Sequence, residues 1–286
     1  MATKTVQDSS LTAIANAIRT KGGTSASLEF PDEFVSAIGT IGGFTENQIA
    51  SESISGSIEI TETTVQACAF FNNAGITAIS CPNATKIMDA AFQKCTGVTS
   101  CSFPNVTQIY WKSYAGFGAS GLTVIFPKLT TLSGTSGALD DYSSTNGGMF
   151  VRSGFSKIAL PALTASIPNW AFAVCPNVTE VDLNTSGLGQ NVFNGSSNLA
   201  VIVLRRTAGI VSLGNTNTFT GTPFASGGTG GTIYIPKSLY DALGTGTNDY
   251  KAASNWSTID GYGTITWAKI ESSYYETHYA DGTVIV

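Results

Sequence analysis

The sequence predicts a solenoid that is mainly β with short helices, in which a coil of about 22 residues recurs about six or seven times. Two periodic features carry this prediction: boundary residues at a nearly constant spacing, and a short apolar segment before each boundary. The boundaries lie at Pro82, Pro104, Pro127, Pro161, Asn184 and Arg206. Their spacings are 22, 23, 34, 23 and 22 residues, so one coil carries an insertion.

The apolar segment before a boundary has its apolar residues at positions x, x+3 and x+5. The clear sets are Ile76, Ile79, Cys81; Val98, Cys101, Phe103; Phe155, Ile158, Leu160; Val178, Val181, Leu183; and Leu199, Ile202, Leu204. A further set, Gly121, Val124 and Phe126, fits this spacing poorly. Alternate residues of a strand point to the same side, so each set predicts a short strand, and parallel stacking of the strands joins the sets into one core.

A phenylalanine six residues before position x predicts the opposite wall of that core. These residues are Phe70, Phe92, Phe172 and Phe193, and the third residue after each is Asn73, Cys95, Cys175 or Ser196. A small side chain there suits a tight interior corner where it meets backbone groups. The five cysteines are accordingly expected to be small core residues. Coils stack about 4.8 Å apart, so Cys95 and Cys175 lie too far apart for a disulfide.

These motifs resemble a known repeat family. The pattern Pro-Asn-x-Thr-x-Ile, followed by Ala-Phe-x-x-Cys-x-x-Val-Thr-x-Val-x-Leu, is similar to the BspA-like leucine-rich repeats of bacterial surface and phage proteins, over roughly residues 58–270. The closing stretches, residues 232–239 and 250–257, are similar to the way such arrays end. The resemblance implies a leucine-rich-repeat solenoid with a β-rich C-terminal cap, in which Trp256 covers the last coil.

The two ends of the chain follow different patterns. Residues 1–45 predict a helical attachment segment, because Leu11, Ile14 and Ile18 share one helical face and Gly22–Gly23 ends the helix. Residues 46–270 form the predicted solenoid and cap. Residues 271–286 predict a β-hairpin that turns at Asp281–Gly282.

The stretch from Leu11 to Gly23, with residues 28–34 after it, resembles a leader of tail-associated proteins in phages and prophages of Gram-positive gut bacteria. This resemblance implies attachment to other virion proteins. The N-terminus lacks the apolar core of a secretory signal, which agrees with assembly in the bacterial cytoplasm and release by lysis. A virion location is therefore expected, with the cell surface as the alternative.

Composition excludes several other classes of protein. The formal net charge is −5 and the basic residues are scattered, so a nucleic-acid partner is not expected. No apolar run is long enough for membrane insertion. No catalytic motif, metal-ligand spacing or cofactor signature stands out, and the one histidine, His278, has no candidate nucleophile nearby. The chain is expected to be neither an enzyme nor a cofactor-binding protein.

Three groups of residues are candidates for binding. Asp140, Asp141 and Tyr142 lie in the inserted stretch, which is either a ligand-binding loop or a solvated excursion. Tyr110, Trp111 and Tyr114 form an aromatic cluster that suits either a carbohydrate or protein contact or the core of a distorted coil. Glu180 and Asp182 are expected to point outward from a strand.

Val201 and Val203 are also expected to point outward, and exposed valines predict a cover, either the C-terminal segment or another subunit. The leading functional hypothesis is a tail-associated virion protein whose solenoid binds a host-surface glycan or protein or neighbouring virion subunits. A homo-oligomer is expected, with a trimer favoured by analogy with tail fibres. The alternatives are a bacterial cell-surface adhesin and, more remotely, a glycan-active enzyme with paired carboxylates.

Overall fold

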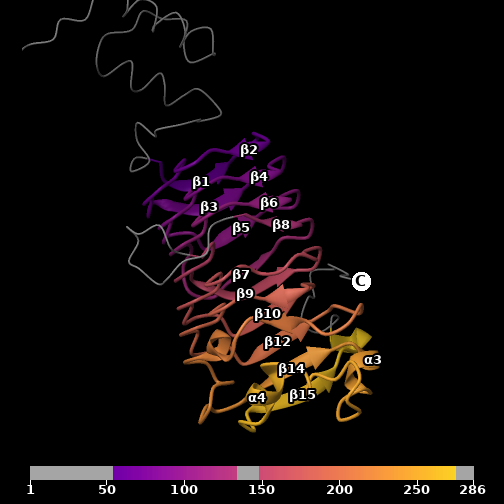
Figure 1. Cartoon of the computed structure of the whole chain (residues 1–286). Helices are drawn as coiled ribbons and strands as arrows, with labels where there is room; N and C mark the ends of the chain where they lie inside the picture. The colour runs from indigo at the N-terminus through magenta and orange to yellow at the C-terminus, as the bar shows by residue number, and fades with distance from the viewer. Residues whose placement is uncertain (1–53, 134–147, 275–286) are drawn as a thin grey trace, which may run out of the picture. The chain divides into compact units, whose positions relative to one another are not determined.

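The computed structural model describes residues 54–133 and 148–274 of the 286-residue chain (Figure 1). The chain divides into two units, Met1–Ile49 and Ala50–Val286, and the fold described here belongs to the second. Several sequence predictions lie outside the described residues: the helical segment with Leu11, Ile14 and Ile18, the insertion with Asp140, Asp141 and Tyr142, and the hairpin beyond Tyr274. They stay predictions.

The described chain consists of short strands separated by turns, with a few short helices. The long strands are β1 (Gly56–Glu59), β3 (Ile76–Ser80), β5 (Ser100–Ser102), β7 (Leu122–Ile125), β9 (Phe155–Leu160), β10 (Glu180–Leu183), β12 (Val201–Leu204), β14 (Gly231–Ile235) and β15 (Ile265–Lys269). The two-residue strands are β2 (Thr64–Val65), β4 (Lys86–Ile87), β6 (Gln108–Ile109), β8 (Thr131–Leu132), β11 (Gly187–Leu188) and β13 (Ser212–Leu213). The helices are the 3₁₀ helix η1 (Thr216–Phe219), α3 (Lys237–Tyr240) and α4 (Trp256–Asp260), and the last described residues, 272–274, are also helical.

Successive coils stack in parallel, as the repeat period predicts. One wall consists of the long strands in the orders β1-β3-β5 and β7-β9-β10-β12-β14-β15, and its outer surface is called the strand face below (Figure 1). A second wall consists of the two-residue strands in the orders β2-β4-β6-β8 and β11-β13. Within each sheet, a strand pairs with the strand of the next coil, so that Val181 aligns with Ile158 on one side and with Ile202 on the other. The register of the sheet therefore places equivalent residues of successive coils next to each other.

The one irregular coil breaks the strand wall between β5 and β7. Leu122, not Gly121, takes the first apolar position there, since it pairs with Phe155 and is buried. The pairing then shifts by one residue, so that Val124 aligns with Ile158. The poor fit of this coil to the repeat pattern thus reflects a register shift, and the core continues through it.

The apolar sets face inward as predicted. All fifteen residues of the five clear sets are buried except Cys101, which is half-buried against the same core. A single core cluster runs from Ile60 to Ile259. The chain therefore builds one continuous core from small sets that could not fold alone.

The phenylalanines of the opposite wall form a column of rings, one for each coil. Phe70 stacks on Phe92 at a centroid distance of 5.5 Å, and Phe172 lies between Phe150 at 4.9 Å and Phe193 at 5.8 Å. Its members in order are Phe70, Phe92, Tyr114, Phe150, Phe172, Phe193 and Phe219. Tyr114 is therefore a core residue of the irregular coil, which overturns its candidacy as a binding residue.

The small residues after the column make the predicted corner contacts. The Cys95 thiol donates to the carbonyl oxygen of Phe70 at 2.9 Å, and the Ser196 hydroxyl donates to that of Phe172 at 2.7 Å. Each bond ties a coil to the one before it. The five cysteines are free thiols, and Cys68 departs from the prediction because it is exposed. Its backbone is left-handed, with φ of 57°, at the start of a turn outside the core.

The C-terminal cap continues the strand wall by two parallel strands, β14 and β15. Trp256 is fully buried and closes the core, as predicted. Its ring lies 5.8 Å from Phe219, and its indole N–H donates to the carbonyl oxygen of Val211 at 2.7 Å.

Candidate binding faces of the solenoid

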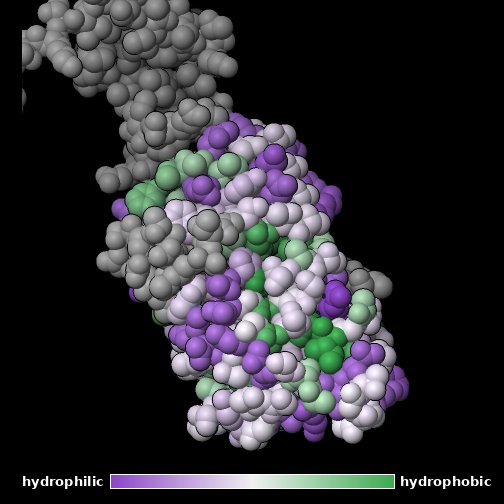
Figure 2. Space-filling model, in the orientation of Figure 1, coloured by the Kyte–Doolittle hydropathy of each residue, from purple (hydrophilic) through white to green (hydrophobic). Residues whose placement is uncertain are grey.

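The first half of the strand face carries small polar side chains. Thr77 on β3 and Ser100 and Ser102 on β5 are exposed, and Ala78 and Ser80 are half-buried. Over most of the visible surface Figure 2 shows weakly polar and hydrophilic residues, with strongly hydrophobic ones gathered in its middle and lower parts. Side chains this short leave the face open to close approach by a partner.

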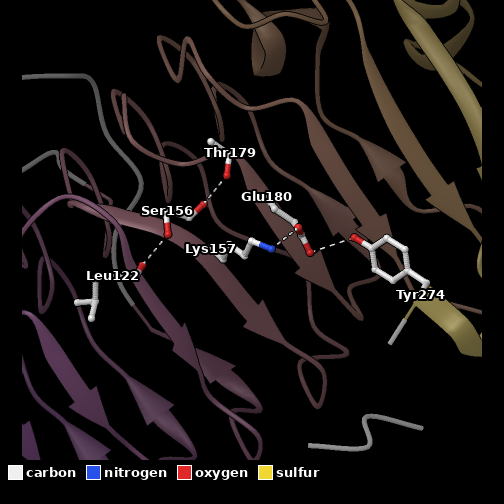
Figure 3. A network of polar contacts seen from close by, with 6 residues as sticks. All are labelled: Leu122, Ser156, Lys157, Thr179, Glu180 and Tyr274. Carbon is white, nitrogen blue, oxygen red and sulfur yellow. Dashed lines mark hydrogen bonds and ion pairs between the residues drawn. The ribbon is translucent and has the colours of Figure 1, made fainter. Parts of the chain in front are cut away.

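Hydroxyl groups along one edge of this face bond to the neighbouring coil. Thr99 Oγ1 donates to the Thr77 carbonyl oxygen at 3.1 Å, and Thr179 Oγ1 donates to that of Ser156 at the same distance. Ser156 Oγ in turn donates to the Leu122 carbonyl oxygen at 3.4 Å (Figure 3). This ladder fixes the spacing of the coils along the edge and stiffens the face.

The second half of the strand face carries charges that are covered. Glu180 and Asp182 on β10 were expected to be available on an outward surface, but only 4% of Glu180 and 0% of Asp182 is exposed. Lys157 Nζ lies 3.2 Å from Glu180 Oε2, and the Arg205 guanidinium forms a two-pronged ion pair with Asp182. The expectation of solvent-accessible binding carboxylates is therefore wrong, because both are buried in ion pairs.

The segment after β15 provides the cover. Tyr274 donates its phenolic hydrogen to Glu180 Oε1 at 3.0 Å, across 94 positions of sequence (Figure 3). Its ring lies 4.5 Å from that of Tyr234 on β14. Burial, and then the nearby Glu180 carboxylate, raise the pKa of Tyr274 well above its ordinary value. The phenol therefore stays protonated and available as a donor.

The valines of β12 lie beneath this segment. Val203 is fully buried in a small cluster with Ala159 and Tyr274, and Val201 and Ile270 pack against the cluster half-buried. In the described structure these outward valines are thus covered by residues of the same chain. An isolated patch of this kind would otherwise present apolar surface to water.

Of the three aromatic candidates in the irregular coil, one lies in the core and two lie at a corner of the coil. Tyr110 and Trp111 are half-buried at the corner after β6, whereas Tyr114 belongs to the column. The Trp111 amide donates to Asp89 Oδ1 of the preceding coil at 3.0 Å. Lys112 Nζ lies 4.4 Å from the Trp111 ring centroid, a cation–π contact. This corner is called the Trp111 corner below.

The two ends of the insertion meet the Trp111 corner. The Ser133 amide donates to the Ile109 carbonyl oxygen at 2.8 Å, and the Tyr114 amide donates to that of Met149 at 2.9 Å. The described residues that flank the insertion therefore lie beside Ile109 and Tyr114, which stand on either side of the Trp111 corner in the sequence. Asp140, Asp141 and Tyr142 themselves lie outside the described residues.

Lys157, Arg205 and Tyr274 are functional-site residues that sequence reasoning missed. A signal existed for the first two, because Lys157 precedes Glu180 by 23 residues and Arg205 follows Asp182 by 23. One coil period thus places opposite charges side by side, as the pairing of Lys157 with Glu180 shows. Tyr274 had no such signal, because it follows the last coil.

Within residues 54–133 and 148–274, no three histidine, cysteine or acidic side chains gather in a way that could hold a metal ion. In the same part of the chain, no helix has the length and apolar character needed to cross a membrane.

Stacked parallel coils, inward apolar sets and the ladder of corner contacts define a leucine-rich-repeat solenoid. A family model described as the BspA type leucine rich repeat region, in six copies, matches residues 27–136 and 139–225. The chain belongs to this family, whose members are typically binding scaffolds without enzymatic activity.

Two further comparisons add little beyond the family. A crystal structure of a leucine-rich repeat protein from Bacteroides ovatus is similar at 17% identity and a TM-score of 0.45. The match covers 69% of this chain and 55% of the other, so this chain spans little more than half of that protein's length. No curated protein matches the sequence significantly.

Proposed function

We propose that this chain is a non-enzymatic binding scaffold of a phage or prophage particle, tail-associated, which holds a macromolecular partner on the open half of its strand face. The observation that carries the binding role is the exposure of Thr77, Ser100 and Ser102 on a face stiffened by a parallel strand wall. Solenoids characteristically bind through extended surfaces of this kind. Short side chains also lose little conformational entropy when a partner orders them.

The particle assignment rests on the resemblance of the stretch from Leu11 to Gly23 to leaders of tail-associated proteins. In this proposal the N-terminal segment contacts other virion proteins, and the solenoid contacts a glycan or protein on the host surface. A homo-oligomer, with a trimer as the first candidate, would present several such faces at once and raise avidity.

The alternative is a bacterial cell-surface adhesin, which the BspA-type repeats equally support. Peptide mass spectrometry on purified particles and on cell envelopes of an induced producing strain separates the two. Antibody labelling in the electron microscope then locates the chain. Labelling at the tail supports the particle assignment. If the chain is found in cell envelopes and is absent from the particles, the adhesin alternative is supported instead.

Two substitutions test the binding face itself. Ser100→Arg and Ser102→Arg place a long charged side chain on the exposed half of the strand face, and Thr131→Arg on β8 places the same group on the second wall. Fluorescently labelled chain is titrated onto intact host cells and bound fluorescence is counted by flow cytometry. We expect the β5 variants to lose binding at least tenfold while Thr131→Arg retains it; equal binding by all three would exclude this face.

The Trp111 corner is the second candidate contact region, since its indole is only half-buried and is therefore partly accessible to a partner. An aromatic ring suits contact with a glycan or a protein surface. Trp111→Ala in the same cell-binding assay distinguishes the regions, because a loss there with unchanged Ser100→Arg binding moves the contact to this corner.

A further inference from the structure

The covered half of the strand face is built like a peptide-binding site. Its floor is apolar, made by Ala159 and Val203 with Val201 and Tyr234 beside them. At the β10 side of this floor stands the Glu180 carboxylate, whose Oε2 is held by Lys157 at 3.2 Å. A hydrophobic floor with one fixed, oriented polar group is the usual composition of a selective binding site.

The present occupant of this site is a short piece of the chain's own C-terminal segment. The Ile270 amide donates to the Ile235 carbonyl oxygen at 2.9 Å, which carries the chain past the end of β14. Four residues later Tyr274 packs its ring on Tyr234 and donates its phenol to Glu180 Oε1. The Tyr274 amide donates to the Glu271 carbonyl oxygen at 3.0 Å, so the segment ends in a helical turn. It thus reaches from β14 to β10 with an aliphatic and a phenolic anchor.

We propose that this half of the strand face is a recognition site for a short peptide in a helical turn that carries an apolar residue followed four positions later by tyrosine, and that residues 270–274 are its resident internal ligand. The phenol is selected by the hydrogen bond to Glu180, because a neutral donor facing an ionic acceptor forms a stronger bond than two neutral groups do. A peptide of the same chemistry competes with the internal segment for the same floor. This inference stands independently of the particle assignment.

Competition sets the expected affinities. The internal segment is tethered, so its effective concentration at the site is on the order of millimolar. An external peptide of equal intrinsic affinity displaces it only when the peptide concentration exceeds this effective concentration. Removing the Tyr274 side chain empties the site without shortening the chain. The full-length variant Tyr274→Ala should therefore bind such a peptide where the unmodified chain does not.

The probe is a synthetic peptide of residues 268–274, Ala-Lys-Ile-Glu-Ser-Ser-Tyr, with a dye at its N-terminus, titrated by fluorescence anisotropy. We expect saturable binding to full-length Tyr274→Ala and at least tenfold weaker binding to the unmodified chain. A probe with phenylalanine in place of its tyrosine, or the double variant Tyr274→Ala with Glu180→Gln, should each bind about tenfold more weakly, as loss of a hydrogen bond to a charged group implies. Tyr262→Ala, which removes an exposed tyrosine elsewhere, is the matched control and should not open the site.

Tyr274→Phe covers the case in which Tyr274→Ala does not fold, because it keeps the ring and loses only the phenolic bond. It should bind the tyrosine probe more tightly than the unmodified chain does. The inference is overturned if a folded Tyr274→Ala chain shows no saturable binding of the probe, or if the unmodified chain binds it equally well. Indifference to the phenol or to Glu180→Gln overturns the assigned selectivity.

Discussion

The rings of Phe150 and Phe172 lie parallel, 4.9 Å apart with an interplanar angle of 6°, although the insertion ends only just before Phe150. The two residues belong to successive coils, and each also contacts the next ring outward in the column. The column therefore passes through the irregular coil without a gap.

The column makes a quantitative prediction. Phe172→Ala should lower the free energy of unfolding by about 3–5 kcal/mol, because it removes a fully buried ring and leaves a cavity between two others. Chemical denaturation followed by circular dichroism measures the change. Phe71→Ala, next to the column but 39% exposed, is the matched control and should change stability by less than about 1 kcal/mol. Equal effects of the two would contradict a column that carries the core.

A second prediction concerns the close approach of neighbouring coils at Gly97. A Cβ added there would lie 2.2 Å from the Ala74 carbonyl oxygen and 2.9 Å from that of Ile76. Gly97→Ala must therefore push two coils apart and should cost about 1–3 kcal/mol or more. Asn177→Ala, at the equivalent position of a later coil that already accepts a side chain, should cost far less. Thermal unfolding of both variants checks this, and a harmless Gly97→Ala would show that the coils are not so closely packed.

The five thiols should differ sharply in reactivity. Burial raises the pKa of the Cys101 and Cys95 thiols to about 12 and that of Cys175 to about 11, and it raises that of Cys81 well above its ordinary value. Only a thiolate reacts readily, so at pH 8 a disulfide reagent should modify Cys68 alone in the folded chain and all five in denaturant. Cys68→Ser should abolish the fast reaction. Rapid modification of more than one thiol in the folded chain would argue against the buried corners.

Replacing Tyr114 with phenylalanine should stabilise the folded chain. Its hydroxyl is buried and has no hydrogen-bond partner among the described residues, so Tyr114→Phe should raise the free energy of unfolding by about 1 kcal/mol at pH 7. Tyr250→Phe is the contrasting variant. It loses a hydrogen bond from the Val211 amide at 3.0 Å and should destabilise the chain.

The same tyrosine predicts a pH dependence. Burial raises the pKa of Tyr114 well above its ordinary value of 10.0, so folding favours the protonated phenol. The contribution of the protonated phenol to the free energy of unfolding is complete below pH 10. It is lost as the pH rises further, because Tyr114 ionises in the unfolded chain before it ionises in the folded chain. Between pH 9 and 11 the stability of Tyr114→Phe should therefore fall less than that of the unmodified chain. Parallel denaturation curves at each pH test the slope, and identical slopes would exclude this linkage.

Sequence reasoning was most accurate where a feature repeats. The apolar sets, the corner residues Cys95 and Ser196, and the closing role of Trp256 follow from local spacing and recur in coil after coil. It failed where one coil departs from the others. Leu122 replaces Gly121 because the strand register shifts, and Tyr114 fills a column position that the pattern reserves for phenylalanine.

The sequence by itself determined the coil period, the parallel stacking and the residues that face inward, because each of these depends on side chains close together in the chain and is reinforced at every repeat. Only the tertiary structure decided which outward residues are available. Glu180, Asp182 and Val203 occupy outward positions and are nevertheless buried. Tyr274, far away in sequence and outside the repeat, contacts Glu180 and Val203, and Arg205 pairs with Asp182. A contact between a repeated surface and a unique terminal segment has no period, so only the folded chain reveals it.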